Sequence, residues 1–413
     1  MSILNIITIL VVLTAILGYL NARFLKLPDT IGVMVTAIVF SILILVVNSI
    51  FPEPFVFVKE LVTKINFTEV LLDGFLSIFL FAGALQTDGD SLKTMRGPVL
   101  LFATVGVLVS ALLIGAMMFV GFELLNFKIP FIHCLLFGAL ISPTDPIAVL
   151  GILKKARISK SLEIKIVGES LFNDGMGIVI FLTVFHVAQL GGGKITSIDI
   201  SLLFVEEIGG GILLGLSLGY LAHFLMGSIN NPQIEVLITL AVVLGGYWLA
   251  NQLNFSGALA MAIAGLMVGH KGFHTNDISE ATENYVDRFW ELLELFFSTI
   301  LFLLIGLQLI IIPFNLQYLL AGVLTIPIVL LARYVSVFFP LYVFEKSLTL
   351  ALQEGLIMTW GGLRGGISIA LVLALEPDMS RELLLTVCYI IVAFSIIIQG
   401  LTVGRLAKKY RNI

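Results

Sequence analysis

The chain has 413 residues, of which 59% are hydrophobic and only 12% are Asp, Glu, Lys or Arg, with a mean hydropathy of +1.10. The charged share is about half the soluble-protein norm, which excludes a soluble domain that must cover its surface with charge. The net charge of −4 is small and spread out, and no basic tract indicates nucleic acid. Because lipid can cover an apolar exterior, the composition predicts an all-α integral membrane protein surrounded by a bilayer.

Apolar runs of about twenty residues, enough to cross the hydrocarbon, recur from end to end. The first run lacks a basic segment and a cleavage site, so we interpret it as a span and not as a signal peptide. The chain is expected to form one membrane unit, residues 1–413, without a soluble regulatory domain. Its expected spans, about thirteen in all, lie near residues 2–21, 29–51, 66–86, 97–121, 131–153, 162–190, 201–228, 234–251, 255–270, 288–312, 316–344, 350–375 and 383–407.

The positive-inside rule orients these spans. With the N-terminus outside, the cytoplasmic links hold about 16 Lys and Arg residues and the outer links about five, which places the C-terminus in the cytoplasm. The short chain without a regulatory tail favours a bacterial inner membrane. Gly211, Gly215 and Gly219 have GxxxG spacing, which predicts close helix packing. Cys134 and Cys388 lie inside apolar runs and are interpreted as packing residues.

Charges at mid-membrane cost roughly 2.5–3.5 kcal/mol each on insertion scales, so each one marks a functional candidate. In the fifth span, Pro143 and Pro146 bracket Thr144 and Asp145. Prolines at this spacing predict an unwound helix, in which carbonyls such as that of Thr144 are free to coordinate a cation and Asp145 lies among half-helix ends. The alternative is a simple kink with a buried, protonated aspartic acid.

The sixth span carries a second polar group, within Gly168-Glu-Ser-Leu-Phe-Asn-Asp-Gly175. At 100° per residue, Glu169, Ser170, Asn173 and Asp174 fall within an arc of about 140°. This face is rich in hard oxygen donors, which suit a small hard cation and not zinc or copper. The alternative is a polar contact that only holds helices together.

The twelfth span contains Trp360-Gly-Gly-Leu-Arg-Gly-Gly366, in which four glycines weaken the helix around Arg364. A guanidinium keeps its proton, so Arg364 needs a carboxylate partner, for which we choose Glu169. Arg333, in the eleventh span, is interpreted as structural, either reaching the cytoplasmic interface or pairing with an acid that the sequence does not identify.

Interruptions in the fifth and twelfth spans are typical of a secondary transporter with inverted repeats and a site at the midplane. Asp145 and Asp174 titrate as a coupled pair, so their site holds either protons or a sodium ion. Alternating exposure of such a site produces exchange without ATP, and the chain has no phosphate-loop motif. No cofactor is expected, and the absence of HExxH and GxSxG patterns argues against an enzyme.

The segments SPTDP, GESLFNDG and WGGLRGG closely resemble those of the NhaP/NHE-like sodium/proton antiporters, the first branch of the monovalent cation:proton antiporters. All three lie in family order on the expected spans. The resemblance implies a six-helix core, which includes residues 131–190 and 350–407 and contains crossed, broken fifth and twelfth spans. It also implies a separate dimerisation domain, a homodimer and elevator-type movement of the core.

Site residues follow from the same resemblance. Asp174 looks like the essential ion- and proton-carrying carboxylate, preceded by the family's Asn173, and Asp145 matches the second aspartate. Thr144 and Ser170 match residues that help to coordinate the ion. The resemblance thus implies that Na⁺ binds at Asp174, Asp145, Thr144 and Ser170.

The resemblance further implies that Glu169 and Arg364 form the pair that locks the geometry of the site. The Asn-Asp order at 173–174 resembles the electroneutral branch, and the tenth span lacks the lysine of the electrogenic branch. One position departs from the family pattern, because Phe81 stands where many members carry a third-span acid.

The predicted function is exchange of Na⁺, and also of Li⁺, for H⁺. A potassium/proton antiporter on the same scaffold is the nearest alternative, because ligand number and cavity size decide between the two ions. A passive cation channel, which would carry current without a proton gradient, is a more distant alternative.

Overall fold

The computed structural model describes residues 3–48, 52–145, 147–156, 158–189, 197–229, 231–269, 280–313, 315–343 and 351–410. Every regular element within these ranges is a helix, as the composition predicted. The first part of the chain contains α1 (Ile3–Leu20), η1 (Asn21–Leu25), α2 (Asp29–Val47), α3 (Pro52–Lys64), α4 (Phe67–Glu69), η2 (Val70–Phe75), α5 (Leu76–Leu85), α6 (Gly89–Thr94), α7 (Arg96–Leu101), η3 (Phe102–Gly106) and α8 (Val107–Leu124), where η marks a π-helical turn.

The middle of the chain contains the longest helices of the described residues, together with shorter ones. They are α9 (Phe131–Ile141), α10 (Ile147–Ala156), α11 (Lys160–Gln189), α12 (Ser197–Gly227), α13 (Pro232–Gln252), α14 (Gly257–Gly269), α15 (Glu280–Gln308) and α16 (Leu316–Val343). The chain then continues through α17 (Leu352–Gly361), α18 (Gly366–Leu373), α19 (Arg381–Phe394), η5 (Ser395–Gln399) and α20 (Gly400–Tyr410).

Ten helices of the described residues are long and apolar enough to cross a membrane, or eleven if the bent pair α17 and α18 is one span. The short apolar helices α9 and α14 begin within two residues of two further expected spans. The count of thirteen therefore stays a prediction. The link expected between the second and third spans contains α3, a helix that the hydropathy pattern did not indicate.

Two of the expected spans are interrupted where their sequences contain breakers. Helix α9 ends at Ile141 and α10 begins at Ile147, so the Pro143 segment lies between two half-helices; Pro146 is outside the described residues. Helix α17 ends at Gly361 and α18 begins at Gly366, with a bend of 48° between them. Both breaks free backbone groups that need partners from elsewhere.

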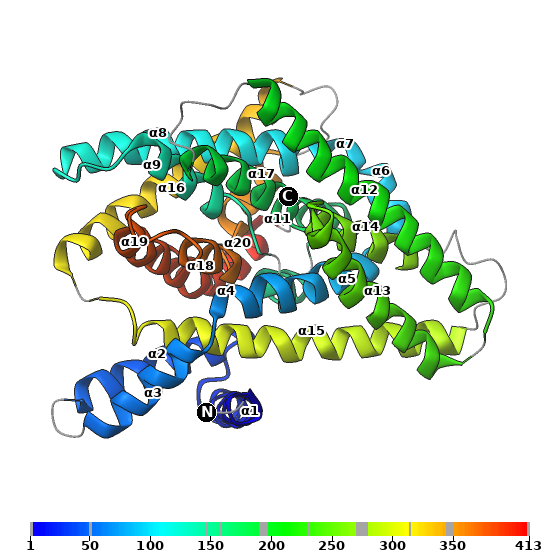
Figure 1. Cartoon of the computed structure of the whole chain (residues 1–413), viewed down its shortest axis with the longest axis horizontal. Helices are drawn as coiled ribbons and strands as arrows, with labels where there is room; N and C mark the ends of the chain where they lie inside the picture. The colour runs from blue at the N-terminus through cyan, green and yellow to red at the C-terminus, as the bar shows by residue number, and fades with distance from the viewer. Residues whose placement is uncertain are drawn as a thin grey trace.

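The glycine repeat of α12 packs against α14, which confirms the close packing predicted from its spacing. A Cβ atom at Gly211 would lie 2.7 Å from the carbonyl oxygen of Ser256, and one at Gly215 would lie 2.6 Å from that of Ala260. In Figure 1 these helices lie with α13 and α5 on the right, and the long helix α15 runs horizontally below them, above α1, α2 and α3. Helices α8, α9, α16, α18 and α19 gather on the left.

Candidate ion-binding site

The two breaks contact each other through their backbones. The amide of Asp145, in the first break, donates to the carbonyl of Leu363 in the second break at 2.8 Å. In the other direction, Nη1 of Arg364 donates to the carbonyl oxygens of Ser142 and, at 2.8 Å, of Pro143. These bonds satisfy groups that the interrupted helices leave without helical partners. The two breaks therefore hold each other in place.

Small residues allow this close approach. A Cβ atom at Gly365 would strike the carboxylate of Asp145, and one at Gly177 of α11 would strike the ring of Pro143. Any larger side chain at either glycine would push the first break away from its neighbours. Gly365, one of the glycines that weaken the twelfth span, thus also leaves space for the Asp145 carboxylate of the fifth span.

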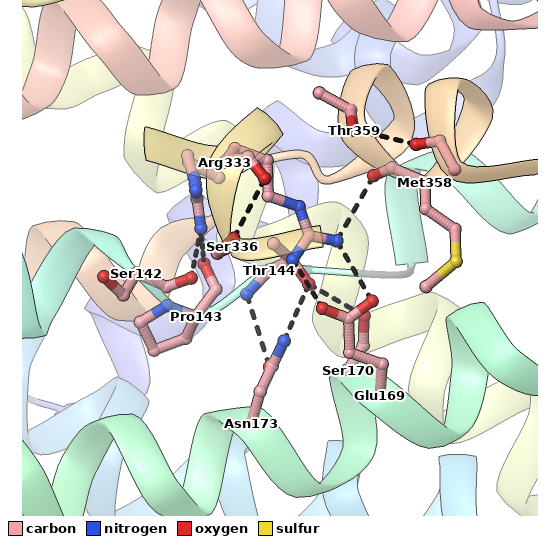
Figure 2. Close-up of polar contacts among 12 residues, drawn as sticks. Ser142, Pro143, Thr144, Glu169, Ser170, Asn173, Arg333, Ser336, Met358 and Thr359 are labelled. Atoms are coloured by element: carbon pink, nitrogen blue, oxygen red, sulfur yellow. Dashed lines mark hydrogen bonds and ion pairs between the residues drawn. The ribbon is translucent and has the colours of Figure 1, made fainter. Parts of the chain in front are cut away.

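Helix α11 is tied to the first break by hydrogen bonds between polar side chains (Figure 2). Nδ2 of Asn173 donates to Oγ1 of Thr144 at 2.8 Å, and Oδ1 of Asn173 accepts from the Thr144 amide at 3.3 Å. The hydroxyls of Thr144 and Ser170 are 3.1 Å apart. All three residues are buried. Asn173 thus orients the break and adds no charge.

Asp145, Ser170 and Asp174 line one cavity of about 110 Å³. Asp174 is 7% exposed, and Asp145 is half-buried. The cavity follows α11 from Lys160 to Asp174, about 21 Å of helix at 1.5 Å per residue. The structure therefore brings both predicted aspartates and one predicted hydroxyl to a single space that reaches the end where α11 begins.

The expected partner of Glu169 is corrected by the structure. The Glu169 carboxylate accepts from Arg333 of α16, at 2.5 Å for Nη1 and 3.0 Å for Nη2, and Nη2 also donates to the Met358 carbonyl at 3.2 Å (Figure 2). Arg364, the predicted partner, instead donates to the carbonyls of the first break. The prediction was wrong because the broken helix offers carbonyls close to Arg364, while α16 brings a second guanidinium to Glu169.

The π-helical turn η5 provides hydrogen-bond partners for backbone groups at the second break. Oγ of Ser395, the first residue of η5, accepts from the Arg364 amide at 2.9 Å. Nε2 of Gln399, the last residue of η5, donates to the carbonyl of Trp360 at 3.0 Å. Widened turns of this kind often occur at functional sites. The sequence analysis did not identify either side chain.

The cavity is also charged near the start of α11, which sequence reasoning missed. Its lining there includes Asp88, Lys160, Glu163 and Glu294. Asp88 follows the third expected span and caps α6. For Asp88, the useful signal in the sequence was an acidic residue directly after an apolar run.

Phe81, at the position where the family pattern has an acid, is fully buried, and its ring centroid lies 4.7 Å from that of Trp290.

Fold and site together define a polytopic membrane protein with a cavity lined by two carboxylates, next to two interrupted helices. A family model described as "Sodium/hydrogen exchanger, transmembrane" matches residues 10–409. The chain therefore belongs to the sodium/hydrogen exchanger family, as the three motifs predicted. Members of this family are secondary transporters, not enzymes.

Two relatives agree with this assignment, and one solved structure agrees with the fold. The chain is 43% identical to the Na⁺/H⁺ antiporter NhaP of Pseudomonas aeruginosa, over 98% of this chain and 96% of that protein. It is 30% identical to the Na⁺/H⁺ antiporter NhaH of Halobacillus aidingensis, over 94% of this chain and 93% of that protein. The sodium proton antiporter MjNhaP1 of Methanocaldococcus jannaschii has the same fold, with a TM-score of 0.76, 22% identity and full coverage of both chains.

Proposed function

We propose that this protein exchanges Na⁺, and also Li⁺, for H⁺ at Asp174 and Asp145, with Thr144 and Ser170 as further ligands. The observation that carries the proposal is the cavity that Asp145, Ser170 and Asp174 line together. Carboxylate, hydroxyl and carbonyl oxygens are the donors that a small hard cation prefers. The names of the relatives support sodium as the substrate.

Competition between the two ions follows from the charge of the site. Two carboxylates that line one cavity repel each other, and either a proton or a sodium ion relieves that repulsion. Loading with sodium on one side and with a proton on the other exchanges one positive charge for another. We propose this electroneutral stoichiometry because Asn173 is neutral and is engaged with Thr144.

Transport also requires exposure to both sides. The cavity is lined by residues of η2, α5, α10, α11, α15 and α18, from both early and late parts of the chain. We propose that the core, which includes residues 131–190 and 350–407, moves as a unit against the rest of a homodimer. If the N-terminus is outside, the start of α11 is cytoplasmic, and the cavity opens inward.

Asp88 is expected to attract the cation to the cavity. Its carboxylate accepts from the Ser91 hydroxyl at 2.6 Å and from the Ser91 amide at 3.4 Å, and these bonds hold the pKa of Asp88 below its ordinary value. Asp88 therefore stays ionised from about pH 6 to about pH 9. Asp88→Asn should raise the KM for Na⁺ several-fold across that range and leave the maximal rate nearly unchanged, because it weakens cation attraction and not the site itself.

The matched control is Asp90→Asn, which neutralises an exposed acid outside the cavity lining. Sodium-dependent proton flux in proteoliposomes at several sodium concentrations separates KM from maximal rate. An Asp88→Asn protein with the same KM as the control would contradict this role.

The proposed exchange is tested by proton movement in proteoliposomes with a preset pH gradient, read with a pH-sensitive dye. Na⁺, Li⁺ and K⁺ are added in turn, and the voltage is clamped with valinomycin and potassium in the first two runs. Dequenching by Na⁺ and Li⁺ that does not change with voltage is the expected result. A response to K⁺ alone, measured without valinomycin, would favour the potassium/proton alternative.

A further inference from the structure

A small cavity lies beside the second break, separate from the ion-binding cavity. It is bounded by α16, the end of α17 and the junction of α19 with η5, and its charged lining comes from Arg333 and Arg364. Gln399 and Thr359 add polar groups, and the other side chains of the lining are apolar. The volume is about 10 Å³, close to what one water-sized sphere needs.

Two guanidinium nitrogens of this lining have no hydrogen-bond partner among the described residues: Nε of Arg333 and Nη2 of Arg364. The two side chains are 6% and 2% exposed. Nε of Arg333 lies close to Gly362, another lining residue. A Cβ atom added to Gly362 would be 2.6 Å from this nitrogen. A buried charged donor without a partner is strongly unfavourable.

The two arginines of this network bind different groups. Glu169 is bound through both oxygens by Arg333, so this pair is neutral. Arg364 adds one positive charge and binds only carbonyl oxygens through Nη1. An acceptor between the two guanidinium groups would satisfy both open donors.

We propose that this cavity binds one small hydrogen-bond acceptor, a chloride ion or a water oxygen, that bridges Nε of Arg333 and Nη2 of Arg364. The bridge would connect the arginine that holds Glu169 to the arginine that holds the first break. Its role is to position these groups, and it is not transported. The amide of Gln399 is fixed beside the cavity by its bond to the Trp360 carbonyl at 3.0 Å.

The wild-type protein tests the site directly. Crystals grown with bromide in place of chloride are measured at the bromine absorption edge. An anomalous peak within hydrogen-bond reach of both nitrogens supports a halide, and density there without anomalous signal supports water. An empty cavity, in a map that resolves ordered water elsewhere in the protein, would overturn the proposal.

Gln399→Glu provides an independent test, because its carboxylate would itself be an acceptor for both guanidinium groups. We expect this variant to melt no lower than wild type. The control Gln308→Glu makes the same change at a residue that is also 3% exposed but outside this cavity, and it should melt several degrees lower. Equal losses in the two variants would also overturn the proposal.

Melting in chloride and in gluconate then distinguishes the two occupants. With a halide, wild type melts lower in gluconate and Gln399→Glu does not. With water, neither protein responds to the change of anion.

Discussion

Asp174→Asn should reduce cation-dependent proton exchange to the level of empty liposomes and leave the melting temperature close to that of wild type. The amide keeps the size of the side chain but neither releases a proton nor carries the charge that holds Na⁺. Asp174 is 7% exposed and lines the cavity with Asp145, so the variant loses both the charge and the titratable group at this position of the site. Proton flux and melting curves measured on the same preparation check both parts.

The control is Asp29→Asn, which makes the same change at an exposed acid outside the cavity. It should transport as wild type does. If Asp174→Asn transported at near-normal rates while correctly folded, Asp174 would not be the carrier.

Arg333→Met should destabilise the protein by about 3–5 kcal/mol, because removal of one partner of a buried ion pair leaves an uncompensated charge. The remaining charge is that of Glu169, which is 1% exposed and whose two oxygens both accept from Arg333. The Met358 carbonyl loses a donor as well. Melting of the purified protein in detergent, with sodium held constant, measures the effect.

Two comparisons identify the cause of this loss. The double variant Glu169→Leu/Arg333→Met removes both charges and should recover a large part of the lost stability. Arg288→Met removes one partner of an exposed pair, Arg288 and Glu291 at 3.3 Å, and should cost little. Similar melting temperatures for the Arg333 and Arg288 variants would contradict the structural role of Arg333.

The membrane class and the three polar segments were predictable because hydrocarbon tolerates few polar groups. Prolines and glycines also indicated where helices end, and the structure has helix ends at Ile141 and Gly361. The face of α11 followed from helical periodicity, which needs no knowledge of neighbouring helices. Each of these inferences depends on residues close together in the sequence.

The partner of Glu169 could not be predicted, because it lies far from Glu169 in the sequence. Spacing along the chain does not tell which of two distant arginines faces an acid, and the carbonyls that bind Arg364 exist only because another helix is interrupted. Asp88 was missed because it lies in a link, where an acid is ordinarily a solvated surface group.

The mutual contacts of the two breaks have a consequence for biosynthesis. Arg364 binds carbonyls that are 221 and 222 residues earlier in the chain. A nascent chain therefore inserts its first break long before the ribosome has made the partner, and the polar backbone must be hydrated or shielded in the meantime. Any product that stops before α17 would present this unfinished surface to the bilayer, where membrane quality control can recognise it.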